Sequence, residues 1–314
     1  MRVFVIITLL LIITFGCTTN NYYDIKKEYY NSEYYSSIGL ENLIQQRIKY
    51  SDIYKVKVGI IDSGFTANKS LINSVLLNSK SGNKISNISY ENHGDIVSGI
   101  IGSKKIKKNN FQGFLPEINL YLYNISNSMT EEKMIEAIEE MISQKMDVIN
   151  ICLTTSKYNE RLYIAIKNAV DSGATIIASS GNSGDKTNLY PAAFDIEGVL
   201  SVSATDLLFN VYKNSTNNKY VDIWAPGEHI YSNNGKNPNE IKKYDGTSVA
   251  TPIVTSLVVL IKAKFPRLTP PEIESLIKKG AYRYQAKWGT QNVNISLINF
   301  YNSLELATHY YKQR

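Results

Sequence analysis

This chain of 314 residues contains few cysteines and histidines, and neither sign of charge is in large excess. Its two cysteines are too few for the disulfide framework of a small secreted scaffold. The formal net charge of +6 is mild, so no nucleic-acid partner is expected, while a position near an anionic membrane is compatible with it. With 43% hydrophobic and 20% charged residues, the composition is that of a globular protein and excludes the disordered and fibrous classes.

The N-terminal apolar run from Val3 to Phe15 is shorter than the roughly 20 residues of a membrane-spanning helix. A positive residue before it and Gly16-Cys17 after it are typical of a secretory signal. The place of Cys17 resembles a bacterial lipoprotein signal, although Thr14 stands where leucine is usual. Residues 1–17 are therefore predicted to be a lipoprotein-type signal peptide. An uncleaved anchor, or plain secretion with cleavage near Gly16, are the alternatives.

The protein is therefore predicted to be secreted across the bacterial cytoplasmic membrane and held on its outer face by lipid on Cys17. Residues 18–54 are polar and rich in tyrosine, and we expect a tether or a short N-terminal extension there. The stretch between Cys17 and Lys55 is too short for a separate folded domain with a core of its own. Residues 55–314 are expected to form the globular domain.

Short apolar runs alternate with amphipathic helical patterns from Val56 onward. Apolar runs of this kind are typical of buried strands in a parallel sheet, and the helices between them would cover it. The sequence therefore predicts an α/β fold with a mostly parallel sheet and helices on both faces. The runs lie at 56–61, 120–125, 148–153, 175–178 and 199–204, and the helical patterns at 131–144, 161–172 and 249–264.

Polar residues stand where the predicted strands end and where helices begin. Asp62 ends the first run and Asn182 follows the run at 175–178, while His93 and Ser248 lie in turns that enter helices. A hydroxyl activated by imidazole, a carboxylate that orients the imidazole, and an amide donor for an oxyanion are the parts that acyl transfer needs. Taken singly, each has a structural interpretation as a turn residue or a helix N-cap.

Four segments resemble the signatures of subtilisin-like serine proteases, and they occur in that family's order. The likeness extends over about residues 55–300 and implies a three-layer subtilisin-like fold, with a peptidase domain at 55–314. The segments are Asp62-Ser63-Gly64, His93-Gly94-Asp95-Ile96-Val97-Ser98-Gly99, Ser180-Gly181-Asn182 and Gly246-Thr247-Ser248-Val249-Ala250-Thr251-Pro252.

The resemblance implies a role for each matching residue. Ser248 would be the nucleophile, His93 the general base and then acid, and Asp62 the carboxylate that orients His93. The Asn182 side chain and the Ser248 backbone N–H would form the oxyanion hole. The substrate would be a peptide or protein, and a monomer is expected.

Substrate-binding positions depart from the family's pattern. Cys152-Leu153-Thr154 stands where Ser-Leu-Gly is usual, and Leu189 stands near the pocket floor where glycine is common. With Gly181, residues Leu153, Thr154 and Leu189 are predicted to bind substrate. The bulk of Leu189 predicts a shallow pocket that takes a small or modest apolar residue before the cut. Cys152 itself is expected to be a buried hydrophobe.

No cofactor and no metal are predicted. Many relatives bind calcium near the segment that follows the His93 helix, where this chain has Lys104–Asn110. Four lysines there disfavour a divalent cation, so calcium is possible but not supported. The alternative without a functional role is that these lysines lie in a solvent-exposed loop.

We expect a membrane-tethered serine endopeptidase of restricted specificity, such as one that removes the leader of a lantibiotic-type precursor peptide. A general extracellular protein-degrading subtilase and a catalytically idle lipoprotein binding module are the alternatives. An esterase with a Gly-x-Ser-x-Gly nucleophile elbow would pair Ser248 with His309 and Glu272 or Glu305. The elbow needs an apolar strand just before it, and Ile241–Asp245 is mostly polar.

Overall fold

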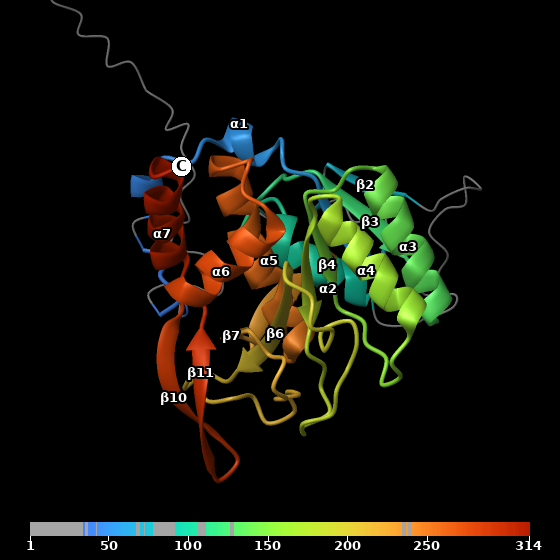
Figure 1. Ribbon diagram of the computed structural model, residues 1–314, viewed down its shortest axis with the longest axis vertical. Coiled ribbons are helices and arrows are strands. Elements are labelled where there is room, and N and C mark those ends of the chain that lie inside the picture. Colours follow the sequence, from blue (N-terminus) through green and yellow to red (C-terminus); the bar gives the residue numbers. More distant parts are fainter. Residues whose placement is uncertain are drawn as a thin grey trace, which may run out of the picture.

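A nine-stranded sheet forms the centre of the described chain, in the order β10-β11-β7-β6-β5-β4-β1-β3-β2 (Figure 1). This computed structural model describes residues 34, 37–41, 43–66, 70–71, 73–77, 92–105, 111–125, 129–233, 237 and 240–314. The strands of the sheet are β1 (Val58–Asp62), β2 (Ser74–Leu76), β3 (Leu120–Asn124), β4 (Val148–Ile151), β5 (Thr175–Ser179), β6 (Val199–Thr205), β7 (Ile223–Pro226), β10 (Tyr282–Trp288) and β11 (Gln291–Leu297).

Strands β1 to β7 of this sheet pair in parallel, β11 joins β7 in parallel, and the hairpin β10-β11 is antiparallel. Strands β1, β4, β5, β6 and β7 are buried along their whole length, which is why most of their residues are apolar. Their carboxyl ends meet at one edge of the sheet. Side chains that follow these strands therefore gather there.

Helices cover both faces of the sheet. Helices α3 and α4 pack side by side on one face, and α2 and α5 pack together on the other (Figure 1). The predicted α/β fold with a mostly parallel sheet is confirmed. The helices are η2 (Leu43–Gln46), α1 (Tyr50–Ile53), α2 (His93–Gly102), α3 (Glu131–Ser143), α4 (Glu160–Asp171), α5 (Thr247–Lys264), α6 (Pro270–Gly280) and α7 (Phe300–Lys312).

Local chemistry sets several helix starts. The Thr130 and Asn159 side chains accept from backbone N–H groups in the first turns of α3 and α4. Thr269 and Glu272 form a capping box at α6. In the described part of the chain, α5 alone is long and apolar enough to cross a membrane, but most of it is buried as the central helix of the core.

The structure describes part of the predicted tether or short N-terminal extension at 18–54, and that part packs on the domain as an extension of it. Tyr34, Ile38, Leu40 and Leu43 are buried in the same apolar cluster as α5. The backbone at Ile38 and Gly39 accepts hydrogen bonds from the first residues of α7. The described part of this segment belongs to the domain because its apolar side chains cover the core. The predicted signal peptide and Cys17 lie outside the described residues.

A second, separate sheet pairs β8 (Ile230–Asn233) with β9 (Ile241–Tyr244) in antiparallel fashion. The polar stretch before Ser248 is thus a strand, although it is largely exposed and stands apart from the parallel sheet. A nucleophile elbow follows a strand of the main sheet, and β9 is not one.

Candidate active site

Asp62 and His93 form a hydrogen-bonded pair at the carboxyl end of β1. The distance from Asp62 Oδ1 to His93 Nδ1 is 2.7 Å, and the same oxygen accepts from the Ser63 N–H at 2.6 Å. Asp62 is fully buried, whereas the His93 side chain is 31% exposed. The pair thus presents a carboxylate on the inside and an imidazole toward solvent. Such a carboxylate fixes the orientation of the ring and stabilises its cation.

Two glycines let β1 and α2 approach each other at this pair. Gly64 has φ of +74°, a conformation that glycine adopts without strain. The Gly94 N–H donates to Ser63 O at 2.7 Å. A Cβ on Gly94 would lie 2.5 Å from the Phe65 ring. The His-Gly dipeptide is therefore a requirement of close packing as well as a motif.

Ser248 lies in the first turn of α5, half-buried, on an 18-residue helix. Gly246 precedes it with φ of +126°, where any other residue would be strained. The Thr247 N–H donates to Asn182 Oδ1 at 3.0 Å, and the Thr247 hydroxyl lies 3.2 Å from the same oxygen. Asn182 follows β5, so the structure brings it to the N-terminus of α5, one residue from Ser248.

Cys152 connects the surroundings of Asp62 and Ser248. Strands β1 and β4 pair with Ile61 opposite Ile151, so Cys152 comes next to Asp62 in the register. Its thiol lies 3.5 Å from the Ser248 carbonyl oxygen and 3.2 Å from Asn150 Oδ1. Burial, and then the charge of Asp62, raise the pKa of the Cys152 thiol well above its ordinary value. A thiol held protonated is a poor nucleophile, as expected for a buried cysteine.

The predicted substrate-binding residues lie on two adjacent segments. Backbone hydrogen bonds join Thr155 to Tyr190 in both directions, at 2.9 and 2.8 Å. These bonds hold the segment of Leu153 and Thr154 beside the segment that contains Leu189. The Leu189 side chain packs so closely over Gly181 that a Cβ on this glycine would collide with Leu189 Cδ1. Leu153 and Leu189 are half-buried and Thr154 is exposed.

Asp95, noted in the sequence only as a departure from the family's pattern, is a buried carboxyl beside this site. It is fully buried in the first turn of α2. Asp95 Oδ2 accepts from the Thr66 N–H at 3.0 Å and from the Thr66 hydroxyl at 2.7 Å. Burial raises the pKa of Asp95 to about 7; the Thr66 hydrogen bonds oppose this shift and the charge of Asp62 adds to it.

The residues of the elbow-type esterase are not brought to Ser248. Lys264 Nζ, at the C-terminal end of α5, donates to the Thr308 hydroxyl at 3.0 Å. Ser248 and Lys264 lie about 24 Å apart along the helix, so His309 is at the opposite end of α5 from Ser248. His309 lies on a regular helix, because α7 continues to Lys312.

His229 forms a second pair with an aspartate. Asp245 Oδ1 accepts from the His229 backbone N–H at 2.6 Å and lies 3.3 Å from His229 Nδ1. Both side chains are about 40% exposed, with values of 43% and 40%. The backbone bond holds His229 in its left-handed conformation, with φ of +57°. We interpret this pair as a structural contact that stabilises the turn before β8.

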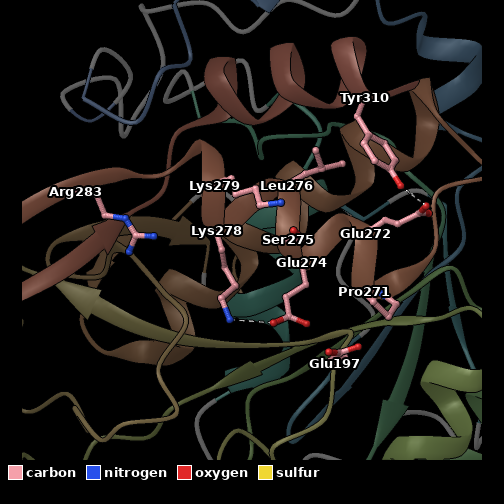
Figure 2. Close-up of a pocket in the computed structure, with 10 residues that line it drawn as sticks. All are labelled: Glu197, Pro271, Glu272, Glu274, Ser275, Leu276, Lys278, Lys279, Arg283 and Tyr310. Carbon is pink, nitrogen blue, oxygen red and sulfur yellow. Dashed lines mark hydrogen bonds and ion pairs between the residues drawn. The ribbon is translucent and has the colours of Figure 1, made fainter. Parts of the chain in front are cut away.

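A pocket of about 640 Å³ lies elsewhere, around α6 (Figure 2). It reaches Glu197, just before the amino end of β6, whereas Asp62 and Asn182 follow the carboxyl ends of their strands. Its charged side chains are largely paired. Lys278 binds Asp222 at 2.6 Å and Glu274 at 3.0 Å, and Glu272 binds Arg314 at 2.8 Å. This network ties α6 to its neighbours, and we assign it no part in catalysis.

Within the described ranges, no group of three or more His, Cys, Asp or Glu side chains could hold a metal ion. Residues 106–110 of the lysine-rich segment lie outside the described residues. The absence of a strong calcium site there remains a prediction.

Known proteins resemble this chain over most of its length. The profile of the subtilase family, peptidase S8, matches residues 54–299. Subtilisin DY of Bacillus licheniformis is 30% identical over 233 residues, covering 72% of this chain and 83% of its own. The major intracellular serine protease of Bacillus subtilis (strain 168) is 31% identical over 226 residues, covering 66% and 68%.

Among solved structures, that of the prenylagaramide maturation protease PagA superposes with a TM-score of 0.70 at 21% identity, covering 86% of this chain and 99% of PagA. At that identity the likeness concerns the fold. Taken with the family profile, these similarities define a serine endopeptidase. The chain belongs to the subtilase family.

Proposed function

We propose that this protein cleaves peptide bonds through an acyl-enzyme on Ser248. In this mechanism His93 removes the hydroxyl proton as Ser248 attacks the carbonyl carbon, and then returns it to the leaving amine. Asp62 keeps the ring in the required tautomer and stabilises the imidazolium. The observation that carries the proposal is the 2.7 Å hydrogen bond from the buried Asp62 to the solvent-facing His93.

Two donors are available for the oxyanion. The Ser248 backbone N–H lies in the first turn of α5, where N–H groups have no intrahelical partner and the helix dipole favours negative charge. Asn182 Oδ1 is occupied by the Thr247 N–H, which directs the amide so that Nδ2 faces away from it. Both donors therefore support stabilisation of a tetrahedral intermediate.

Covalent labelling tests the assignment of the nucleophile. A fluorophosphonate should form one adduct, and peptide mapping by mass spectrometry should locate it on Ser248. An adduct on another serine would contradict the mechanism. No adduct on the folded protein would favour the idle binding module.

We further propose restricted specificity, with a small or modest apolar residue before the scissile bond. The support is the Leu189 side chain, which fills space over Gly181, and the exposed Thr154, which replaces the glycine usual in the family's substrate-binding strand. Precursor processing fits such a site, and the structural neighbour PagA is named a maturation protease. Digestion of a proteome-derived peptide library should yield few cleavages. Broad cleavage would favour the alternative of a general protein-degrading subtilase.

Leu189→Gly is expected to deepen the pocket. Removing this side chain should raise kcat/KM for a peptide with Phe before the cut by about 10- to 100-fold, with little change for Ala, because pocket volume sets the discrimination. The ratio of the two kcat/KM values is the measurement, and it cancels any loss of folded enzyme. The matched control Leu208→Gly removes a leucine that is 74% exposed, and should leave the ratio unchanged. An unchanged ratio in Leu189→Gly would contradict the pocket assignment.

Membrane tethering through lipid on Cys17 is the third part of the proposal, and its support is the sequence pattern alone. Cys17→Ser should abolish incorporation of a labelled fatty acid and move the protein out of the membrane fraction. Both should be measured on the full-length protein in a bacterial host. If the wild type incorporates no label and Cys17→Ser remains in the membrane fraction, the N-terminal segment is an uncleaved anchor.

A further inference from the structure

Two carboxyl oxygens in the described part of the active site have no hydrogen-bond partner although they are buried. They are Asp62 Oδ2 and Asp95 Oδ1. Each residue uses its other oxygen fully: Asp62 Oδ1 binds His93 and Ser63, and Asp95 Oδ2 binds Thr66 twice. An unpartnered buried carboxylate oxygen is costly, so the second carboxyl needs a physical explanation.

Asp95 is tied to the catalytic pair in three ways. It lies on the same helical turn as His93, two residues further on. Its bonds to Thr66 fasten the chain that leaves Asp62 to the start of α2. Its charge interacts with that of Asp62, and two carboxylates in one buried region disfavour each other's ionisation.

Among the residues that the structure describes, few other charges face this region. The elements packed on α2 are α5, β1, β3 and β8. Strand β8 contributes the phenol of Tyr231, and β3 contributes phenols but no charged side chain. The lysines of α5 are Lys262 and Lys264, at its far end. Among the described residues, Asp62 is the charged group that acts on Asp95, and His93 lies on the same helical turn.

We infer that Asp95 is a positioning residue for the Asp62–His93 pair, and that its state of ionisation sets the pH at which His93 begins to act as a base. The inference rests on the proposed triad. Protonated Asp95 leaves one negative charge beside the imidazole. Ionised Asp95 adds a second, which favours the imidazolium and delays the appearance of the neutral base as the pH rises. The raised pKa of Asp95, about 7, places this change in the neutral range.

The test is the pH profile of kcat/KM for the wild type, Asp95→Asn and Asp95→Thr. Both variants remove the charge, so the midpoint of the acid limb should fall by about 0.5 to 1 pH unit. The matched control Asp171→Asn removes an exposed carboxylate on α4 and should leave the midpoint in place.

A purely structural role for Asp95 predicts a lower melting temperature with an unchanged midpoint of the pH profile, and that result in an active variant would overturn the inference.

Should neither variant fold, the wild type supplies the decisive measurement. Because the folded-state pKa of Asp95 is raised, its ionisation destabilises the fold, so stability should fall as the pH rises from about 4 to about 7. Hydrogen-bonded carboxylates at the surface act in the opposite sense below that range. The carboxyl stretch of Asp95 in infrared difference spectra should titrate near pH 7, and titration near pH 4 would overturn the inference. Loss of all activity in Ser248→Ala tests the triad separately.

Discussion

Ser248→Ala is expected to lower kcat for peptide hydrolysis by about 10⁴- to 10⁶-fold while leaving the protein folded. The hydroxyl is the only group that the mechanism asks to form a bond with the substrate. Its loss leaves the oxyanion donors and the binding segments in place, so a small residual rate over water should persist. The measurement is single-turnover and steady-state cleavage of a peptide with Ala before the cut.

Ser256→Ala is the matched control, because Ser256 lies two turns further along the same helix, buried, with its hydroxyl donating to Pro252 O. It should keep near-wild-type kcat. His93→Ala should cost about as much as Ser248→Ala, and the double variant should lose little more, since the two groups act as one unit. His309→Ala should have no effect. Loss of activity in His309→Ala with retention in His93→Ala would instead favour an elbow-type esterase.

Much of the central sheet could be predicted from the sequence because its strands are buried on both faces. The predicted run at 148–153 contains β4 (Val148–Ile151), and the run at 199–204 differs from β6 by one residue. Amphipathic spacing likewise predicts α3, and its observed bounds agree to within one residue. These elements can be recognised in the sequence because their residues are buried either uniformly or with the period of a helix.

The remainder of the fold was not predictable in the same way. Strands β9 and β10 are mostly exposed, so polar residues mask their extended conformation. The segment from Tyr34 to Ile53 has scattered apolar residues without a regular period, and its place on the core depends on contacts with α5 and α7. Such contacts are tertiary, and no local pattern of residues specifies them.

Some residues of the candidate site could likewise be predicted from the sequence, and others could not. The positions of Asp62 and Asn182 after buried strands predict that they lie at one sheet edge, and the structure places them there. The burial of Asp95 depends on Thr66, which belongs to another segment, so the sequence could mark this residue as unusual without indicating its surroundings. The triad roles remain predictions that the variants above test.

Asn182→Ala is expected to lower kcat by about 10²- to 10³-fold with little change in KM, because the amide would bind the oxyanion more strongly than the ground-state carbonyl. Asn182 is exposed and its Oδ1 accepts from the Thr247 N–H, so the fold depends little on it and the amide is held in one orientation. Asn182→Asp is the sharper variant. Its carboxylate can still accept from the Thr247 N–H, yet it offers no donor and sets a negative charge beside the developing oxyanion.

Comparison of the two variants separates positioning from donation. If Asn182 serves only to hold the N-terminus of α5 through Thr247, Asn182→Asp should retain activity and Asn182→Ala should lose it. If Nδ2 binds the oxyanion, Asn182→Asp should be at least as inactive as Asn182→Ala. Asn188→Ala, an exposed asparagine in the same loop, is the matched control and should leave kcat unchanged. A decrease of less than about threefold in both Asn182 variants would show that the Ser248 backbone N–H stabilises the intermediate without a side-chain donor.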